Sequence, residues 1–370
     1  MNKTVLISIG AGTFFSNEKY LLVINIDDGS IFDTFSKKHQ VYNESTKGFT
    51  GISLSKNNAV WICSEAELYK FDLNPISYNN YYTDKIFNDV HYCFYDDNEN
   101  KLFVCNTGLD SVEEFNQNFN HVKSYNLVRK KYFFKTIKSI ISGYYRQYKH
   151  RKSISDIDNN NQTTEKLFYE DIRYKNLKYA DPFNTFKKFF CPSFFYNKKD
   201  DLRFYLFRPH ILHPNFICKI QDNILITLKN TGSVIDLKTG KTIISNLSGP
   251  HDGILKNNIY LITESGKGNL LYSKDIYSIK DLQEKPFETI QVCDPKKGFV
   301  RGVDLIDNNT AVVAVSKRRD ITDEKPAWVA LVDLNSRTIT KKIDIPVIYG
   351  TNPFSVIDIS HLYKGQSDAK

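Results

Sequence analysis

The chain has 370 residues, of which 41% are hydrophobic and 25% charged, and its formal net charge is +8. This composition excludes an intrinsically disordered chain, because it supplies enough apolar surface for a large core. It also excludes a membrane protein with helical spans, since no apolar run reaches about eighteen residues. The N-terminal MNKTVLISIGAG has a short apolar run and no cleavage site after it, so we expect a cytoplasmic protein without an export signal.

The N-terminal part of the chain predicts three consecutive strands, Thr4–Gly10, Tyr20–Ile26 and Ile31–Phe35. They match the second, third and fourth strands of a unit that recurs along the chain. The unit begins with an apolar strand, a turn rich in Asn and Asp, a second strand, a Gly or Ser turn and a third strand. Its first complete copies are GISLSKNNAVWICSEAELYKFDLN and HYCFYDDNENKLFVCNTGLDSVEEFN. The NN and DDNEN turns predict β-hairpins.

Three more copies follow, and the chain ends on a partial one. The copies begin FICKIQDNILITL, GILKNNIYLIT and GVDLIDNNTAVVAV. Phe354–Ile359 looks like a first strand with nothing after it, so it can complete the N-terminal three-stranded unit. Closure of this kind removes the sheet edges that an open array of units would leave. The sequence therefore predicts an all-β fold, a six-bladed β-propeller closed by its C-terminal strand.

One insertion, residues 125–207, separates the propeller sequence into residues 1–124 and 208–370. Within it, Arg129–Lys152 has nine Lys or Arg residues and no acidic residue, with apolar residues at helical spacing. A lid docked on the propeller face is the favoured interpretation of this partly helical insertion. A basic amphipathic helix on an anionic membrane surface is the second. Nucleic-acid contact is disfavoured, because no recognised binding module accompanies the charge.

Three histidines and an arginine recur at one position of the unit, where a short loop enters the first strand: His91, His213, His251 and Arg301. Thr50 occupies this position one copy earlier. Units that stack around an axis bring equal positions together, so we expect these side chains to converge at one mouth of the channel. Neutral imidazoles bind Zn or Fe and leave a coordination position open, which predicts a divalent metal held by the three histidines. An anion site without metal, and copies of a purely structural residue, remain open as alternatives.

Polar residues that follow the second strands should lie on the same face, because the second strand runs back toward the entry of the first. Asn106, Asn230 and Glu264 are such residues. We expect Asn106 and Asn230, together with Thr50, to contact the substrate. Glu264 is the predicted catalytic acid or base.

Two carboxylates adjoin the histidine positions, and one cation completes the predicted site. Asp89 and Asp252 either support Glu264 in proton transfer or orient the imidazole rings. The planar guanidinium of Arg301 suits a carboxylate, sulfate or phosphate group, which predicts a catalytic role in clamping an anionic substrate.

The segment VHYCFYDDNENKLFVCNTGLDSVEEF, with its opening histidine and closing β-turn, resembles a blade of the NHL type. The likeness to NHL and SMP-30/gluconolactonase propellers spans the chain apart from the insertion. The histidine pattern is similar to that of the peptidyl-hydroxyglycine lyase propeller, whose channel zinc is held by histidines from separate blades, with an arginine and a tyrosine beside it. This resemblance implies His91, His213 and His251 as zinc ligands and Arg301 as the substrate clamp. No tyrosine of this chain matches the family's motif.

The pattern as a whole favours a metal-dependent lyase or hydrolase that acts on a small anionic molecule at the channel mouth. The alternative is a non-catalytic propeller that docks to a partner protein, a glycan or a membrane surface through residues 129–152. We expect a monomer that does not bind nucleic acid. The two functions differ in a measurable way, because only the first requires stoichiometric metal.

Overall fold

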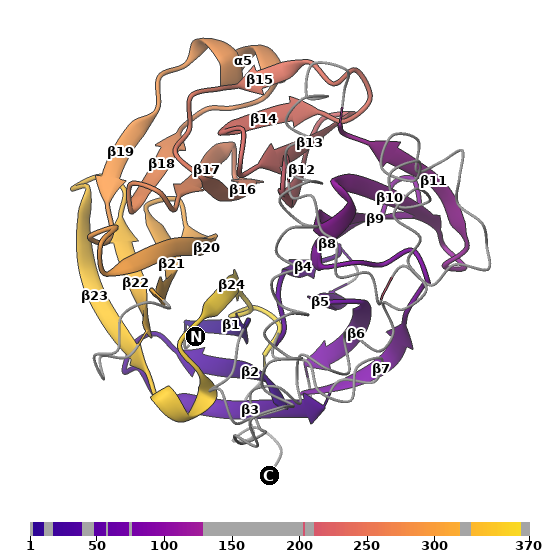
Figure 1. The fold of residues 1–370 in the computed structure, drawn as a ribbon. Helices are drawn as coiled ribbons and strands as arrows, with labels where there is room; N and C mark the ends of the chain where they lie inside the picture. Colours follow the sequence, from indigo (N-terminus) through magenta and orange to yellow (C-terminus); the bar gives the residue numbers. More distant parts are fainter. Residues whose placement is uncertain are drawn as a thin grey trace, which may run out of the picture.

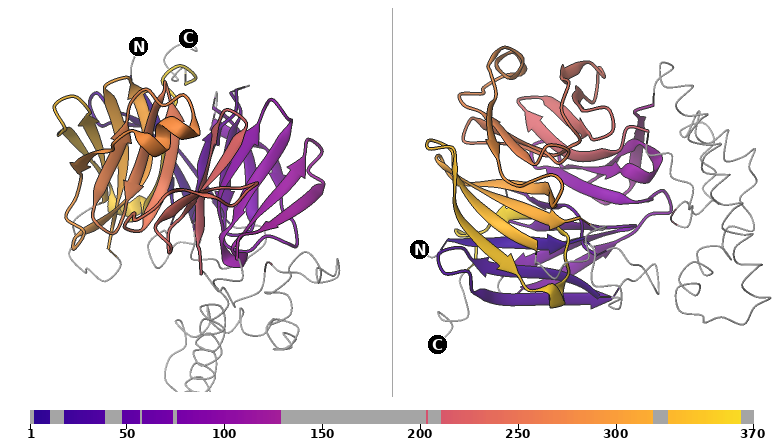
Figure 2. Two further views of the ribbon diagram at one scale, coloured as in Figure 1. Left: turned by 90° about the horizontal axis from the view of Figure 1, so that it is seen from above. Right: turned by 60° about the vertical axis from the view of Figure 1, so that its left-hand side comes forward.

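Six four-stranded sheets form a closed ring in the computed structural model (Figure 1). The described residues are 3–10, 18–38, 48–56, 58–73, 76–128, 203, 211–318 and 327–363. The ring is a six-bladed β-propeller, which confirms the predicted all-β fold class. Seen edge-on, the blades form a disc one strand-length thick (Figure 2).

The first three blades come from the N-terminal part of the chain and the closing strand. Blade 1 contains β24 (Pro353–Asp358), β1 (Thr4–Ile9), β2 (Glu18–Asn25) and β3 (Ile31–Lys38). Blade 2 contains β4 (Ile52–Leu54), β5 (Val60–Ser64), β6 (Glu67–Leu73) and β7 (Ile76–Tyr82). Blade 3 contains β8 (Val90–Asp96), β9 (Lys101–Asn106), β10 (Ser111–Asn116) and β11 (His121–Asn126).

The other three blades follow in order along the chain. Blade 4 contains β12 (Pro214–Ile220), β13 (Asn223–Leu228), β14 (Ser233–Asp236) and β15 (Thr242–Ile244). Blade 5 contains β16 (Pro250–Lys256), β17 (Ile259–Glu264), β18 (Asn269–Ser273) and β19 (Glu288–Gln291). Blade 6 contains β20 (Gly298–Asp307), β21 (Thr310–Lys317), β22 (Ala327–Asp333) and β23 (Thr338–Ile345). In each blade the first strand is innermost, so β24, β4, β8, β12, β16 and β20 surround the centre (Figure 1).

The C-terminal strand closes the ring, as the sequence predicts. β24 pairs antiparallel with β1 in the register Val5↔Asp358 to Ser8↔Ser355. The backbone N–H of Ile359 also donates to the carbonyl of Thr4 at 2.9 Å. Blade 1 is therefore built from both ends of the chain, and β1 has no unpaired edge.

Apolar side chains pack between neighbouring blades rather than within one sheet. The blade 1–blade 2 interface shows the pattern, where Leu6 and Leu21 meet Phe49 and Phe71. The Phe49 and Tyr69 rings contact edge to face, with centroids 5.5 Å apart. Similar clusters join the other blades of the ring. Because each sheet is covered on both faces by its neighbours, its strands are apolar runs with little alternation.

Few other regular elements occur in the described part of the chain. The helix α5 (Ile279–Glu284) lies between β18 and β19 and is capped by Ser278, whose hydroxyl accepts from the N–H of Asp281. The 3-10 turns are η1 (Thr107–Leu109) and η5 (Val347–Tyr349). None of the described helices is long and apolar enough to span a membrane. The helix predicted within Arg129–Lys152 lies outside the described residues, as does the aromatic part of the insertion.

The innermost strands carry a β-bulge near their start in five of the six blades. In blade 3, Val90 pairs with Asn106 and Tyr92 with Cys105, so His91 is the extra residue. The same register shift occurs at Asn215, at His251–Asp252, at Arg301–Gly302 and at Phe354. A bulge re-aims the side chain it contains and is common beside functional sites. All five bulges lie at the same end of the ring, which we call the bulge face.

Hydrogen bonds between blades lock the ring together at the bulge face. At each of the six interfaces, a polar side chain of one blade donates to a backbone carbonyl at the start of the next innermost strand. The pairs are Ser8 to Thr50, Thr50 to Val90, Thr107 to Pro214, Asn215 to Pro250, Ser265 to Val300 and Ser316 to Pro353. Each of these bonds gives a backbone carbonyl at the start of an innermost strand a donor from the neighbouring blade.

Replacing Ser316 by Ala should lower the free energy of unfolding by about 1 to 2 kcal/mol, because it leaves the buried Pro353 carbonyl without its donor. Chemical denaturation measures this loss. The exposed Ser336 provides the control, since its hydroxyl contacts the Thr338 hydroxyl at the surface of the β22–β23 turn and does not join two blades. Equal stability of the two variants would contradict a locking role for the Ser316 hydroxyl.

Candidate functional site

A cluster of four polar residues and one aromatic ring occupies the bulge face, where the innermost strands begin. We call it the axial cluster: His91, His213, His251, Arg301 and Phe354. The Phe354 ring lies 5.3 Å from the His91 ring and 4.7 Å from the His251 ring, measured between centroids. The Arg301 guanidinium carbon is 5.0 Å from the Phe354 centroid, and the His91 and His213 rings are 4.9 Å apart. The structure therefore brings the three predicted histidines and the arginine together around a ring that comes from the closing strand.

The axial cluster has a buried layer and a partly exposed layer. His91 is 8% exposed, His251 is 2% exposed and Phe354 is 6% exposed. His213 and Arg301 are partly exposed. A molecule that approaches the bulge face would consequently meet the guanidinium and one imidazole first, with two more imidazoles beneath them.

His251 and Asp252 form a buried pair inside one bulge. The Nδ1 of His251 lies 2.7 Å from Oδ1 of Asp252. The Asp252 N–H donates to the Thr263 hydroxyl at 3.1 Å, and that hydroxyl donates to the Arg301 carbonyl at 2.8 Å. These bonds fix the pair against blade 6. No hydrogen bond reaches Nε2 of His251 from the part of the chain that the structure describes.

Burial favours the neutral form of both members of this pair. It lowers the pKa of His251 well below its ordinary value, and the positive charges of Arg301 and Lys229 lower it further. Burial raises the pKa of Asp252 well above its ordinary value, with Arg301 partly opposing the effect. In the neutral pair the protonated carboxyl donates to Nδ1, which leaves an N–H at Nε2.

His91 is held by hydrogen-bonding groups on both ring nitrogens. Its Nδ1 lies 3.1 Å from Oδ1 of Asn215, whose amide nitrogen donates to the Pro250 carbonyl at 3.3 Å. Its Nε2 lies 3.4 Å from Oδ1 of Asp89. Asp89 and Asp252 thus contact the imidazoles in the way expected of groups that orient them. His91 bridges blades 3 and 4 and has no ring nitrogen free of these contacts.

The predicted position of His213 in the repeat is wrong by two residues. The register of blade 4 places Asn215, not His213, at the bulge position equivalent to His91 and His251. His213 lies in the preceding loop with φ +57°, a left-handed conformation. Its imidazole still reaches the axial cluster, because it packs edge to face on His91.

Asp110 holds the His213 loop in place. Its carboxylate accepts from the backbone N–H groups of Ile211, Leu212 and His213 at 2.7, 3.0 and 2.8 Å. The Asp110 carbonyl accepts from the N–H of Leu127 at 3.1 Å. One buried residue therefore ties together the described residues on either side of the insertion and positions His213.

The other predicted site residues have contacts of a structural kind. The Asn106 side chain is fully buried and bonds to the Asn88 N–H, the Ile86 carbonyl and Glu113. Thr50 bonds to the next blade, as described above. Asn230 is exposed in the turn after β13, where its N–H donates to Leu212.

Glu264 likewise has its carboxylate occupied. Oε1 accepts from the Ser248 N–H at 2.7 Å and lies 3.7 Å from Nζ of Lys267, and Oε2 accepts from Asn269 at 3.3 Å. These contacts order the loop before β16. Among the carboxylates near the bulge face, Asp252 rather than Glu264 is paired with an imidazole.

The described residues contain no group of three or more His, Cys, Asp or Glu side chains arranged to hold a metal ion. The contacts of His91 give the reason, since both of its ring nitrogens already face Asn215 and Asp89. This arrangement does not fit a three-histidine centre. The divalent metal, Zn or Fe, and its ligation by the three histidines remain a prediction.

Ser124, His121 and Glu113 form a polar group at the rim of blade 3 that only superficially resembles a catalytic triad. Oε2 of Glu113 lies 3.0 Å from Nε2 of His121 and accepts from Ser124 at 2.5 Å. The Ser124 hydroxyl also lies 3.2 Å from the same Nε2. A triad needs the carboxylate and the hydroxyl on opposite ring nitrogens. Here the imidazole of His121 and the hydroxyl of Ser124 both contact the buried Glu113 carboxylate, so they serve as its hydrogen-bonding partners.

Comparisons with known proteins support the fold and leave the activity open. A family model described as "Domain of unknown function (DUF4915)" matches residues 225–349, about a third of the chain. No curated protein matches. A crystal structure of a protein of unknown function from Bacteroides caccae has a TM-score of 0.57 at 10% identity and covers 97% of this chain and 99% of its own.

Two further solved structures also match most of this chain at low sequence identity. The crystal structure of the nidogen/laminin complex has a TM-score of 0.53 at 8% identity, with coverage of 95% of this chain and 97% of that one. The virginiamycin B lyase from Staphylococcus aureus has a TM-score of 0.43 at 8% identity, covering 92% of this chain and 84% of that one. At these identities, the likeness to the Bacteroides caccae and nidogen/laminin structures shows a shared fold alone. The NHL or gluconolactonase type and a site like that of hydroxyglycine lyase stay predictions.

Proposed function

We propose that the protein is an enzyme, a lyase or hydrolase, that binds a small anionic molecule at the bulge face and exchanges a proton with it through His251. The observation that carries this proposal is the His251–Asp252 pair, which is buried, hydrogen-bonded at Nδ1 and close to the cations Arg301 and Lys229. Perturbed titratable groups of this kind are concentrated at catalytic sites.

The chemistry follows from the protonation of the pair. The N–H at Nε2 can protonate a leaving group, after which the proton between Asp252 and His251 moves to Nδ1 and leaves a carboxylate. Nε2 then remains neutral and the new negative charge lies on Asp252, where Arg301 stabilises it. The reverse transfer makes Nε2 a base for abstracting a substrate proton. His251 with Asp252 takes over the role that the sequence assigns to Glu264.

Arg301 and Lys229 support the choice of an anionic substrate. Both cations are partly exposed and both act electrostatically on His251, so an anion held by them lies next to the proton donor. The guanidinium fork provides paired donors for a carboxylate, sulfate or phosphate. Substrate contacts from Thr50, Asn106 and Asn230 have less support, because the first two side chains bond to the protein itself.

Replacing Arg301 by Gln should weaken anion binding by about tenfold or more, the usual loss for a charge-assisted hydrogen bond. Isothermal titration of the full chain with inorganic phosphate and with citrate measures this change. Arg337→Gln, at the rim between β22 and β23, removes the same charge far from the bulge face and should leave affinity unchanged. Equal binding by wild type and Arg301→Gln would refute the anion site.

A bound divalent metal is a second form of the proposal, in which it would polarise the substrate or activate water. Both ring nitrogens of His91 already contact Asn215 and Asp89, so a metal bound by the three histidines would require His91 to give up one of these contacts. Elemental analysis of protein prepared without chelator, wild type beside His91→Ala, decides between the forms. Stoichiometric metal that is lost in the variant supports this second form, and metal-free wild type eliminates it.

A further inference from the structure

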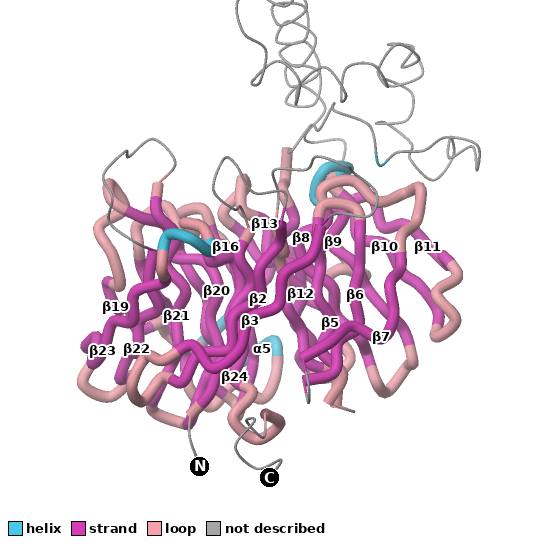
Figure 3. The backbone as a smooth tube through the Cα atoms, turned by 90° about the horizontal axis from the view of Figure 1, so that it is seen from below, coloured by secondary structure: helices cyan, strands magenta, loops and turns pink. Residues whose placement is uncertain are grey.

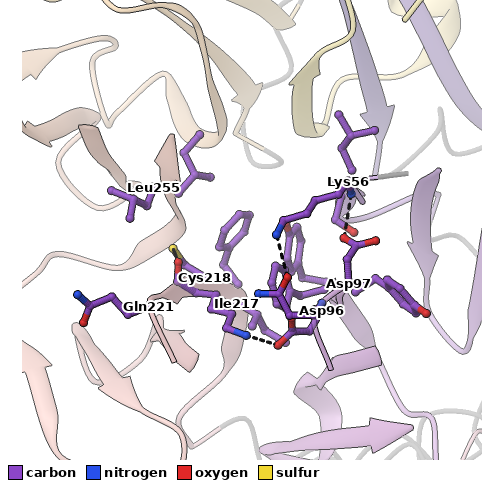
Figure 4. A pocket seen from close by; sticks show the side chains of 16 residues that line it. Lys56, Asp96, Asp97, Ile217, Cys218, Gln221 and Leu255 are labelled. Carbon is purple, nitrogen blue, oxygen red and sulfur yellow. Dashed lines mark hydrogen bonds and ion pairs between the residues drawn. The ribbon is translucent and has the colours of Figure 1, made fainter. Parts of the chain in front are cut away.

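A cavity lies at the opposite end of the innermost strands from the axial cluster. It has a volume of 340 Å³ and is lined by residues of β4, β8, β12 and β16 and the turns after them (Figure 4). β8 begins beside His91 and ends at the cavity with Asp96, and β12 runs from Asn215 to Lys219 in the same sense. These strands run from one end of the ring to the other (Figure 3). The axial cluster and the cavity therefore lie at opposite ends of the ring. The volume falls within the range of small-molecule sites.

Aromatic and aliphatic side chains form the inner wall of this cavity. The Tyr92 and Phe216 rings stack with centroids 3.9 Å apart, and Phe94 lines the cavity beside them. Cys218 and Leu255 complete the apolar surface from blades 4 and 5. Such a wall favours the ring or hydrocarbon body of a ligand.

Charged residues form the outer rim, and the lysines among them already have partners. Nζ of Lys219 forms an ion pair with Asp96, and Nζ of Lys56 donates to Oδ1 of Asn98 at 2.9 Å. Further round the ring, Lys256 pairs with Asp304. Asp96 thus neutralises Lys219, and the Lys56 ammonium is already hydrogen-bonded to Asn98, so both lysines that line the cavity have partners.

Two carboxylates line this rim, Asp96 and Asp97. Asp96 forms an ion pair with Lys219, whereas no ion pair joins Asp97 to a lysine of the described rim. Oδ2 of Asp97 accepts only the backbone N–H of Lys56, at 2.8 Å. Its Oδ1 is buried and has no hydrogen-bond partner among the described residues. A buried acceptor without a donor is costly, so a ligand that supplies an N–H is favoured here.

We infer that this cavity binds a small amine with an aromatic or apolar body. The ammonium group would pair with Asp97, and the body would lie against Phe94 and the Tyr92–Phe216 stack. Aromatic faces add to this preference, because a cation is attracted to the ring quadrupole. An anion of the same shape would be repelled by the Asp97 carboxylate, whereas Asp96 is already paired with Lys219. The inference concerns the cavity alone and does not depend on the activity proposed for the bulge face.

Three probes that share one ring and differ in charge test this inference: tryptamine, 3-methylindole and indole-3-acetate. Isothermal titration of the full chain at neutral pH should give an affinity for tryptamine at least about tenfold above that for indole-3-acetate, with 3-methylindole between them. Equal affinities, or tighter binding of the acetate, would overturn the amine preference. Absence of binding for all three would overturn the site.

Two variants and one control locate the binding. Asp97→Asn should reduce the tryptamine affinity about tenfold and leave that of 3-methylindole unchanged, since it removes the charge and keeps the shape. Leu255→Trp fills the cavity and should abolish binding of both. Asp222→Asn is the matched control, because Asp222 is exposed in the β12–β13 turn and does not line the cavity. Thermal melts show that each variant is folded, and unchanged affinity in folded Asp97→Asn and Leu255→Trp would place any binding elsewhere.

Discussion

A chain that ends at Asn352 should fail to form the closed ring. It lacks β24, whose residues Phe354, Val356 and Ile357 are buried, together with Ile359 just after it. Burial of four such side chains contributes on the order of 6 to 12 kcal/mol, which is comparable with the whole stability of a typical domain. Its removal also leaves β1 as an unpaired edge that can join other chains. We expect no cooperative thermal transition, and aggregation on gel filtration.

A chain that ends at Tyr363 is the matched control, because it keeps β24 and removes only residues outside the described part. It should melt as the full chain does. Adding a peptide of residues 353–363 in excess to the shorter chain should restore the transition. A separate peptide can form the same antiparallel pairing with β1 that β24 forms in the intact chain. A cooperative transition within a few degrees of the full chain's, in the chain that ends at Asn352, would show that closure by β24 is not what stabilises the ring.

The architecture was predictable because its signals are local and repeated. Asn-rich hairpin turns separated apolar runs at regular spacing, and each run became one strand. The strand predicted at Phe354–Ile359 agrees within one residue with β24 at Pro353–Asp358, and the first strand, predicted at Thr4–Gly10, ends one residue earlier at Ile9. The missing first strand in the N-terminal unit specified the closure, because only a partner from the other end of the chain could complete the sheet.

The site was predictable only in part, because a bulge adds a residue to a strand and so shifts which residue of one copy is equivalent to which residue of another. The extra residue in β12 is Asn215, so counting back from the apolar run to the nearest histidine selected His213 instead. Phe354 was predicted only as the first residue of a strand, although its bulge aims it at His91 and His251.

Long-range contacts explain the remaining differences at the site. Glu264 was selected for its position after a second strand, but its carboxylate holds the Ser248 loop. The adjacent letters His251 and Asp252 did suggest an imidazole with a carboxylate that orients it. Their burial, which favours the neutral form of both groups, depends on neighbouring blades and cannot be read from residues 251–252 alone.

Replacing His251 by Ala should remove nearly all turnover, with kcat lowered by about 10²- to 10⁴-fold, the range for loss of a general acid or base. A panel of small anionic esters, lactones and phosphate esters provides the assay, and the best substrate is carried into the variants. Asp252→Asn should lower kcat as well, because an amide cannot transfer a proton to Nδ1 of His251. Glu264→Gln should change kcat little. A larger loss in Glu264→Gln than in His251→Ala would return the catalytic role to Glu264.

The same imidazole should also leave a signature in the pH dependence of stability that requires no substrate. The pKa of His251 is lower in the folded than in the unfolded protein, so the unfolded state binds more protons as the pH falls below about 6.5. The contribution of His251 is therefore fully present above that pH and is lost toward acid. Urea unfolding between pH 7.5 and 5 should show a smaller loss of the free energy of unfolding toward acid in His251→Gln than in wild type. His361 is exposed, so His361→Gln serves as the control and should keep the wild-type slope. An unchanged slope in His251→Gln would mean that this imidazole is not held neutral in the fold, and its proposed proton transfer through Nε2 would fail with it.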